Sequence, residues 1–266
     1  MNITNKCVEM PRAAGLPALA YRVQGSGPTV LLVHGVGGDS RTWDAVVPYL
    51  SPQFRTICLD LRGHGRSGVI RAACDISDFT RDVIDVLDAL NVQACRLVGF
   101  SLGATIAQSV ALSAPERVDR LVLLGSVAFR NESERTRVTR RLQELRSLGL
   151  AHAAQTLRNL WFTDDFQKQH PELVEGRVKQ LLECDSESYI YSYAVFANTD
   201  FAERLRDIRM PTLIVVGEND VAAPPHMAKL IHEHIARSEL HILPRVRHSL
   251  PIEAADQVGE ILRASL

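Results

Sequence analysis

Short apolar runs rich in β-branched residues alternate with longer amphipathic stretches along most of this chain. This alternation is typical of βα units around a mostly parallel sheet, because strands that are covered on both faces are apolar throughout. We expect strands at residues 29–34, 54–60, 95–99, 120–125, 211–217 and 239–243, with a weaker one near 18–23. We expect helices at residues 42–50, 76–90, 102–113, 226–235 and 253–264. The pattern predicts an α/β fold with helices on both faces of the sheet.

Residues 127–207 interrupt this alternation. The segment has no strong strand pattern, is rich in charged and aromatic residues, and lies between two expected strands. We expect a helical cap here, inserted into a core domain of residues 1–126 and 208–266. With 266 residues, 46% of them hydrophobic, the chain is long enough to bury one large core.

Charge and cysteine content restrict the partners and the compartment. The net charge is −1, which gives no reason to expect nucleic acid or an anionic membrane as a partner. The five cysteines include no C-x-x-C pair, as is typical of reduced thiols in a cytoplasmic protein. Residues 1–10 are too polar for a signal peptide, and no apolar run is long enough to span a membrane. We expect a cytoplasmic protein that acts on a small molecule, with its oligomeric state left open.

The most specific motif is the sequence Gly-Phe-Ser-Leu-Gly at residues 99–103, which lies between an expected strand and an expected helix. G-x-S-x-G in this setting forms a strained turn that raises the serine hydroxyl above the sheet. The N-terminus of the following helix then points at the anion that develops during attack. The pentapeptide alone can occur by chance in any glycine-containing loop, but its flanking elements favour Ser101 as a nucleophile.

This turn, together with the sequence His-Gly-Val-Gly-Gly at residues 34–38 after the strand at 29–34, resembles the α/β hydrolases. The resemblance implies that the backbone N–H groups of Val36 and Leu102 form the oxyanion hole. We interpret His34 as a structural residue that orients this loop. A serine at position 101 argues against the haloalkane dehalogenases and epoxide hydrolases of this fold, which have aspartate there.

The resemblance also implies an acid and a base, since this family places nucleophile, acid and histidine in that chain order. Asp220 follows the strand at 211–217, and His248 follows the strand at 239–243. His248 would take the proton of the serine, and Asp220 would fix the tautomer of the imidazole. Glu218 and Asp207 are rival acids with poorer spacing.

Two other patterns favour structural interpretations. Residues 63–68 satisfy G-x-G-x-x-G, but residues 69–75 are typical of a loop and not of the helix that a dinucleotide site needs. His226, His232 and His234 lie in one expected helix at spacings that do not bring them to one face. We therefore expect no metal and no organic cofactor.

Arginine and tryptophan side chains are the candidates for contacts with the substrate. Arg41 and Arg130 are candidates to meet an acidic substrate, and Trp43 and Trp161 are candidates to line a pocket, although core packing is the commoner fate of tryptophan. Six arginines between residues 130 and 146 could also meet a carboxylate. Interleaved glutamates there favour a solvated amphipathic helix for most of them.

Nearly the whole chain resembles the 3-oxoadipate enol-lactonases, enzymes of aromatic compound degradation. The similar segments are residues 37–44, 60–67, 114–118 and 189–211, whereas those lactonases often lack the His-Gly pair that begins the 34–38 loop. The resemblance implies attack on a lactone or ester carbonyl and hydrolysis of an acyl-enzyme.

Three alternatives stay open. C–C bond hydrolases of ring meta-cleavage products usually have Trp shortly after the catalytic His and a Gly-Pro-Gly oxyanion loop, and this chain has neither. A short-chain carboxylesterase shares all the motifs. A non-catalytic small-ligand receptor on the same fold can keep an intact triad, and only turnover separates it from an enzyme.

Overall fold

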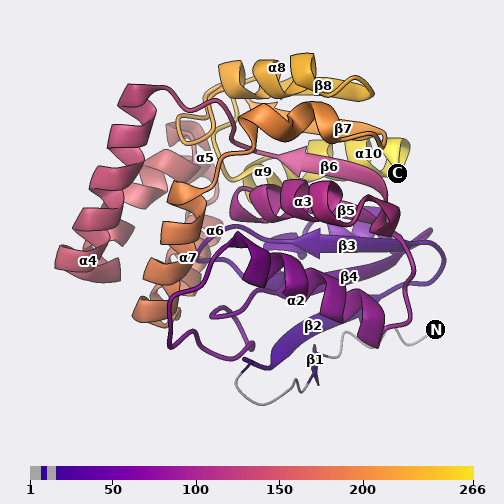
Figure 1. The fold of residues 1–266 in the computed structure, drawn as a ribbon. Helices are drawn as coiled ribbons and strands as arrows, with labels where there is room; N and C mark the ends of the chain where they lie inside the picture. The colour runs from indigo at the N-terminus through magenta and orange to yellow at the C-terminus, as the bar shows by residue number, and fades with distance from the viewer. Residues whose placement is uncertain (1–6, 11–15) are drawn as a thin grey trace.

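The structure is a computed structural model that describes residues 7–10 and 16–266. Eight strands form one sheet in the order β1-β2-β4-β3-β5-β6-β7-β8, in which β2 pairs antiparallel with both β1 and β4 and the other neighbours pair parallel (Figure 1). The strands are β1 (Cys7–Met10), β2 (Leu19–Gln24), β3 (Thr29–Val33), β4 (Arg55–Asp60), β5 (Cys95–Phe100), β6 (Val118–Leu124), β7 (Thr212–Gly217) and β8 (Ser238–Leu243). The mostly parallel sheet predicted from the sequence is confirmed.

Ten α-helices and three short 3-10 helices connect the strands within the described residues. The α-helices are α1 (Val47–Leu50), α2 (Ile76–Ala89), α3 (Leu102–Ser113), α4 (Glu132–Trp161), α5 (Asp164–Gln169), α6 (Pro171–Leu182), α7 (Ser186–Asn198), α8 (Pro225–His234), α9 (Leu250–Glu253) and α10 (Ala255–Ser265). The 3-10 helices are η1 (Ser40–Trp43), η2 (Pro115–Arg117) and η3 (Ala202–Asp207).

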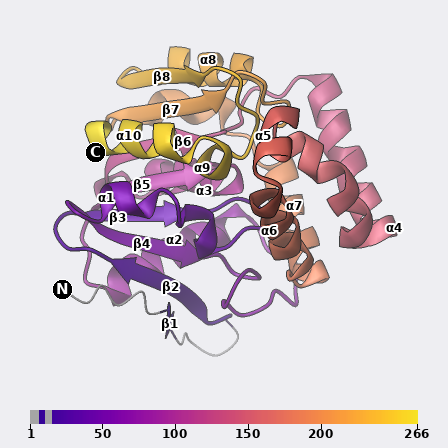
Figure 2. The same cartoon turned by 180° about the vertical axis from the view of Figure 1, so that it is seen from behind.

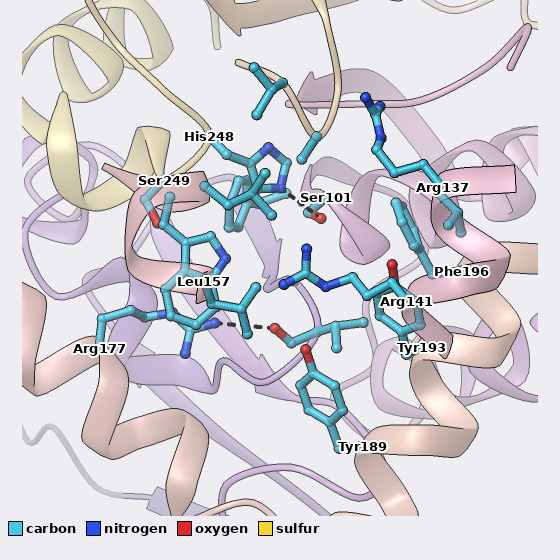
Figure 3. A pocket seen from close by; sticks show the side chains of 18 residues that line it. Ser101, Arg137, Arg141, Leu157, Arg177, Tyr189, Tyr193, Phe196, His248 and Ser249 are labelled. Carbon is cyan, nitrogen blue, oxygen red and sulfur yellow. Dashed lines mark hydrogen bonds between the residues drawn. The ribbon is translucent and has the colours of Figure 1, made fainter. Parts of the chain in front are cut away.

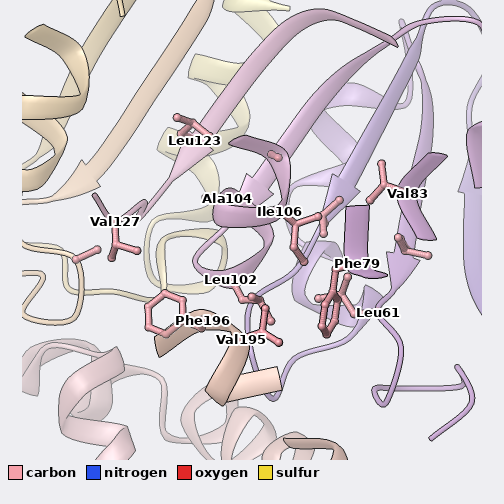
Figure 4. Packing of buried hydrophobic residues seen from close by; sticks show 14 of the residues in the cluster. Leu61, Phe79, Val83, Leu102, Ala104, Ile106, Leu123, Val127, Val195 and Phe196 are labelled. Carbon is pink, nitrogen blue, oxygen red and sulfur yellow. The ribbon is translucent and has the colours of Figure 1, made fainter. Parts of the chain in front are cut away.

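Two hydrophobic cores cover the two faces of the sheet. Along β3, Leu31 and Val33 belong to one core while Val30 and Leu32 belong to the other, because successive side chains of a strand point to opposite faces. Helices α2, α3 and α8 pack on the first face, and α1 and α10 on the second (Figures 1 and 2). Figure 4 shows the first core, where α2 and α3 pack against the sheet and α7 adds Phe196.

Helices α4 to α7 lie between β6 and β7 in the chain and gather beside one end of the sheet (Figures 1 and 2). We call these four helices the cap segment; the division into a core domain and an inserted cap stays a prediction. A capping box of Asn131 and Glu134 begins α4. The helix is broken at Gly149, whose φ of 75° and ψ of 178° are not helical.

The observed elements differ from the predicted ones at two helices, each of which divides into two, and at one additional strand. The predicted helix at 42–50 divides into η1 and α1, and Pro48, which has no backbone N–H to donate, lies in the first turn of α1. The predicted helix at 253–264 divides into α9 and α10 because Ala254, with φ of −129°, leaves the helical conformation. Strand β1 was not predicted. The side chain of Cys7 lies outside the described residues.

Candidate active site

Ser101 occupies a sharp turn between β5 and α3. Its φ of 55° and ψ of −115° place a non-glycine residue in a strained region of backbone conformation. Two glycines allow this turn to pack closely. A Cβ atom at Gly99 would collide with the backbone of Gly103, and one at Gly103 would collide with the backbone carbonyl of Val33. The strand, turn and helix can therefore approach one another only with glycine at both positions.

The structure brings Ser101, His248 and Asp220 into one hydrogen-bonded chain (Figure 3 shows the serine and the histidine). The Ser101 hydroxyl donates to Nε2 of His248 at 3.1 Å, and Nδ1 of His248 donates to Oδ2 of Asp220 at 2.7 Å. Oδ1 of Asp220 accepts from the backbone N–H groups of Ala222 and Ala223, both at 2.8 Å. Because the buried carboxylate holds the proton on Nδ1, Nε2 is left with a free lone pair directed at the serine.

The two rival acids lie elsewhere. The carboxylate of Glu218 is exposed and accepts from the backbone N–H of Arg245 at 3.0 Å. Asp207 pairs with Arg204 at 3.5 Å. Neither carboxylate contacts the imidazole of His248, so Asp220 is the acid that the geometry favours.

The loop of residues 34–38 packs directly against Ser101. A Cβ atom at Gly35 would lie 2.9 Å from Cβ of Ser101, so this glycine keeps the loop within reach of the serine. Leu102 opens α3, where the first backbone N–H groups of a helix have no partner inside the helix. Within residues 7–10 and 16–266, neither Leu102 nor Val36 donates its N–H to another protein atom. Both groups are therefore free to bind an anion beside Ser101.

Two buried histidines hold this loop. His34 donates from Nδ1 to the carbonyl of Gly35 at 2.7 Å and accepts the N–H of Leu61 at Nε2 at 3.0 Å. His64 accepts the N–H of Gly37 at Nε2, also at 3.0 Å. Burial lowers the pKa of His34 to about 4 and the pKa of His64 to about 3. Both imidazoles are thus neutral near pH 7, as accepting a backbone N–H requires.

Arg177 on α6 holds the same loop from the side of the cap segment. Its guanidinium donates to the carbonyl of Gly37 at 2.6 Å and to the carbonyl of Val36 at 3.2 Å, and it lies 4.1 Å from the ring centroid of Trp161. Sequence reasoning missed this residue. A signal was present, because Arg177 lies on the same helical stripe as the buried residue Leu181.

A cavity of about 840 Å³, measured with its open mouth, lies between the cap segment and the ends of the strands (Figure 3). Ser101 and His248 line it, and three arginines also reach it: Arg137, Arg141 and Arg177. Its apolar and aromatic lining includes Val138, Leu157, Leu160, Trp161, Tyr189 and Phe196.

Three of the four predicted substrate contacts lie away from this cavity, which corrects the expectation for them. Arg41 is bound by the carboxylates of Asp39 and Glu183 at 2.6 and 2.8 Å. Trp43 is fully buried in the core on the second face of the sheet. Arg130 donates hydrogen bonds to the backbone carbonyls of Phe196 and Thr199 at the end of α7, so its guanidinium already has partners within the protein. Trp161 does line the cavity, and its contact with substrate stays a prediction.

Within the described part of the chain, no three His, Cys, Asp or Glu residues are grouped so that they could hold a metal ion. None of the described helices combines the length and the apolar character needed to cross a membrane.

Comparisons with known proteins agree with this architecture. The family model of the α/β hydrolase fold matches residues 28–255. A 3-oxoadipate enol-lactonase of Acinetobacter baylyi is 29% identical over 228 residues, which cover 85% of both chains. An (E)-2-((N-methylformamido)methylene)succinate hydrolase of the same organism is 28% identical over 249 residues, which cover 92% of this chain and 93% of the relative.

A solved structure shows the same arrangement in space. The enol-lactonase of Burkholderia xenovorans LB400 superposes with a TM-score of 0.87 at 26% identity, over 92% of this chain and 95% of that one. The sheet order, the serine turn and the matched family model lead to one assignment. The chain belongs to the α/β hydrolase fold family.

Proposed function

We propose that this protein is a serine hydrolase that opens a small lactone or cleaves a small carboxylic ester through an acyl-enzyme. The observation that carries the proposal is the hydrogen-bonded chain of Ser101, His248 and Asp220 at the wall of a cavity. The nucleophile is adjacent to a base, the base is oriented by a buried acid, and two free backbone N–H groups lie beside the nucleophile. This is the arrangement that acyl transfer requires.

In the proposed first step, Oγ of Ser101 attacks the carbonyl carbon while Nε2 of His248 takes the hydroxyl proton. The carbonyl oxygen becomes an oxyanion that accepts hydrogen bonds from the N–H groups of Val36 and Leu102. Collapse of this intermediate breaks the bond to the leaving oxygen, which receives the proton from His248. Asp220 stabilises the transient imidazolium.

In the second step, water loses a proton to His248 and attacks the acyl carbon, and Ser101 Oγ leaves with that proton. The products are a carboxylic acid and an alcohol, joined in one molecule when the substrate is a lactone. In an enol-lactone the leaving oxygen, once protonated by His248, belongs to an enol, which tautomerises to the more stable ketone and so makes ring opening favourable. Relatives named enol-lactonase at 29% and 26% identity support this class of substrate.

Steady-state hydrolysis by the wild type and by Ser101→Ala tests the proposal. Three substrates separate the alternatives: 3-oxoadipate enol-lactone, p-nitrophenyl acetate and a ring meta-cleavage product. Ser113→Ala is the matched control, because Ser113 ends the same helix α3 and is exposed. We expect rapid turnover of a lactone or ester that Ser101→Ala abolishes and Ser113→Ala retains.

Other outcomes would redirect the proposal. Cleavage of the meta-cleavage product alone would identify a C–C bond hydrolase. Tight binding with no multiple turnover would identify a receptor. Ester or lactone hydrolysis that persists in Ser101→Ala would contradict the mechanism.

A further inference from the structure

Arg137 and Arg141 lie one turn apart on α4, and both line the cavity that contains Ser101. Residues four apart on a helix share one face, so their guanidinium groups reach the cavity from the same wall. Within residues 7–10 and 16–266, neither has a carboxylate within ion-pair distance. The neighbouring Arg140, by contrast, points away and pairs with Glu144 at 3.7 Å. The cavity wall thus carries positive charge that the described protein does not neutralise.

The guanidinium of Arg141 points into the cavity, between Ser101 and Tyr189 in the view of Figure 3. Its charge acts on two buried phenols. Burial raises the pKa of both Tyr189 and Tyr193, and the nearby positive charge of Arg141 opposes that rise. Neither phenol hydroxyl hydrogen-bonds to another group in the described part of the chain. One cation and two hydroxyl donors therefore face the same space without partners.

This set of groups has a clear chemical complement. Arg141 is half-buried and has no counter-ion, so its guanidinium has lost part of its hydration. A bound anion would compensate for this loss with an ion pair. A planar guanidinium binds a carboxylate through two parallel hydrogen bonds, and phenol hydroxyls can donate to the remaining lone pairs. Phosphate or sulfate would fit the charge as well, but the apolar walls formed by Leu157 and Phe196 suit a short carbon chain.

We propose that the substrate carries a free carboxylate, separate from the bond that is cleaved, and that Arg141 binds it. This inference rests on the proposed hydrolase function and specifies its substrate class as an acidic lactone or a half-ester of a dicarboxylic acid. Tyr189 and Tyr193 donate hydrogen bonds to the carboxylate, and the more exposed Arg137 adds charge at the mouth. With the carboxylate held on α4, the scissile carbonyl lies at Ser101 on the opposite wall.

Two esters with the same leaving group measure this selectivity. p-Nitrophenyl acetate is neutral, whereas mono-p-nitrophenyl glutarate carries a free carboxylate, and both release p-nitrophenolate. We compare kcat/KM for the wild type, Arg141→Gln and the control Arg140→Gln. If Arg141 forms a charge-assisted hydrogen bond with the free carboxylate, Arg141→Gln should lower kcat/KM for the glutarate ester about tenfold to a hundredfold more than kcat/KM for the acetate ester. Most of this loss should appear as a higher KM. Arg140→Gln leaves the ratio of the two unchanged.

Binding of glutarate to the inactive Ser101→Ala protein, followed by calorimetry, tests the carboxylate site without catalysis. We expect binding that Arg141→Gln weakens by a similar factor in the Ser101→Ala background. If the wild type hydrolyses neither ester and glutarate still binds through Arg141, the hydrolase proposal fails and the carboxylate site stands. If both esters lose activity equally in Arg141→Gln and glutarate binding is unaffected, the carboxylate proposal is overturned.

Discussion

The guanidinium of Arg177 donates a 2.6 Å hydrogen bond to the backbone carbonyl of Gly37. This bond joins α6 of the cap segment to the loop that carries the proposed oxyanion donor Val36. The arginine is buried and lies against the ring of Trp161, so its position is fixed from two sides. The orientation of the loop peptides is therefore set partly by a helix more than a hundred residues further along the chain.

Replacing Arg177 with methionine tests this link. The loop peptides would no longer be held in place, and the transition-state oxyanion would lose part of its stabilisation. We expect kcat to fall by about tenfold to a hundredfold with a smaller change in KM, because the ground state gains less from these donors. Arg177→Lys, which keeps the charge and one donor, should recover part of the rate.

Lys179→Met is the matched control for this variant, since Lys179 is exposed on the same helix. A purely structural role for Arg177 would appear as loss of thermal stability with an unchanged kcat in the folded protein. That result would contradict a role in holding the oxyanion loop.

Asp220→Asn should remove most activity. An amide in this position no longer holds the proton on Nδ1 of His248, so the imidazole is not kept in the tautomer that accepts the serine proton. We expect kcat to fall by about four orders of magnitude. Glu218→Gln removes the nearby exposed carboxylate and should stay near the wild-type rate. The reverse ranking of the two variants would show that the acid has been misassigned.

The buried histidines predict a loss of stability in acid. His34 and His64 have folded-state pKa values of about 4 and about 3, below the ordinary value of about 6.5. Below pH 6.5 the unfolded chain takes up protons at these sites and the folded protein does not. Their contribution is therefore complete above pH 6.5 and is lost as the pH falls toward 4 and 3.

Each of these histidines contributes a slope of up to about 1.4 kcal/mol per pH unit in the free energy of unfolding. Urea unfolding between pH 7 and pH 4.5 measures this slope. His64→Gln should reduce it, because glutamine can accept the N–H of Gly37 without titrating. His152→Gln, at an exposed site, should leave it unchanged. Equal slopes in all three proteins would disprove the assignment.

Two glycines should respond in opposite ways to the same added methyl group. Gly103→Ala places a Cβ against the backbone of Val33, so α3 must move from the sheet, at a cost of about 1–3 kcal/mol or more. Gly176 lies within α6 with no atom within 4 Å of an added Cβ. Gly176→Ala should raise the free energy of unfolding by about 0.5–1 kcal/mol. Denaturant unfolding measures both changes, and a change of the same sign in the free energy of unfolding of the two variants would refute this contrast.

The parts of the fold that the sequence predicted are those whose signals are local. Alternating apolar strands gave the sheet, and the turn at Ser101 could be identified because its glycines, strand and helix are consecutive in the chain. Asp220 and His248 could be named because the resemblance to the α/β hydrolases places the acid and the histidine in the loops that follow the last two predicted strands. These assignments rest on the order of strands, turns and helices along the chain, which the sequence shows directly.

The contacts of the cap segment depend on how helices pack, and the sequence does not specify this. Arg41 and Arg130 carry the same charge as Arg141, yet each is held by groups of the protein itself. No local pattern separates an arginine that faces a cavity from one that binds a neighbouring carbonyl. His64 was missed for a similar reason, since its partner Gly37, in the loop of residues 34–38, is 27 residues away.

The break at Gly149 has a consequence for the geometry of α4. An uninterrupted α-helix turns about 100° per residue, so Arg141 and Trp161, 20 residues apart, would point about 160° away from each other. Both nevertheless line one cavity. The single non-helical residue changes the rotational phase between the two halves of α4, so that faces which a straight rod would turn to opposite sides converge on the same space.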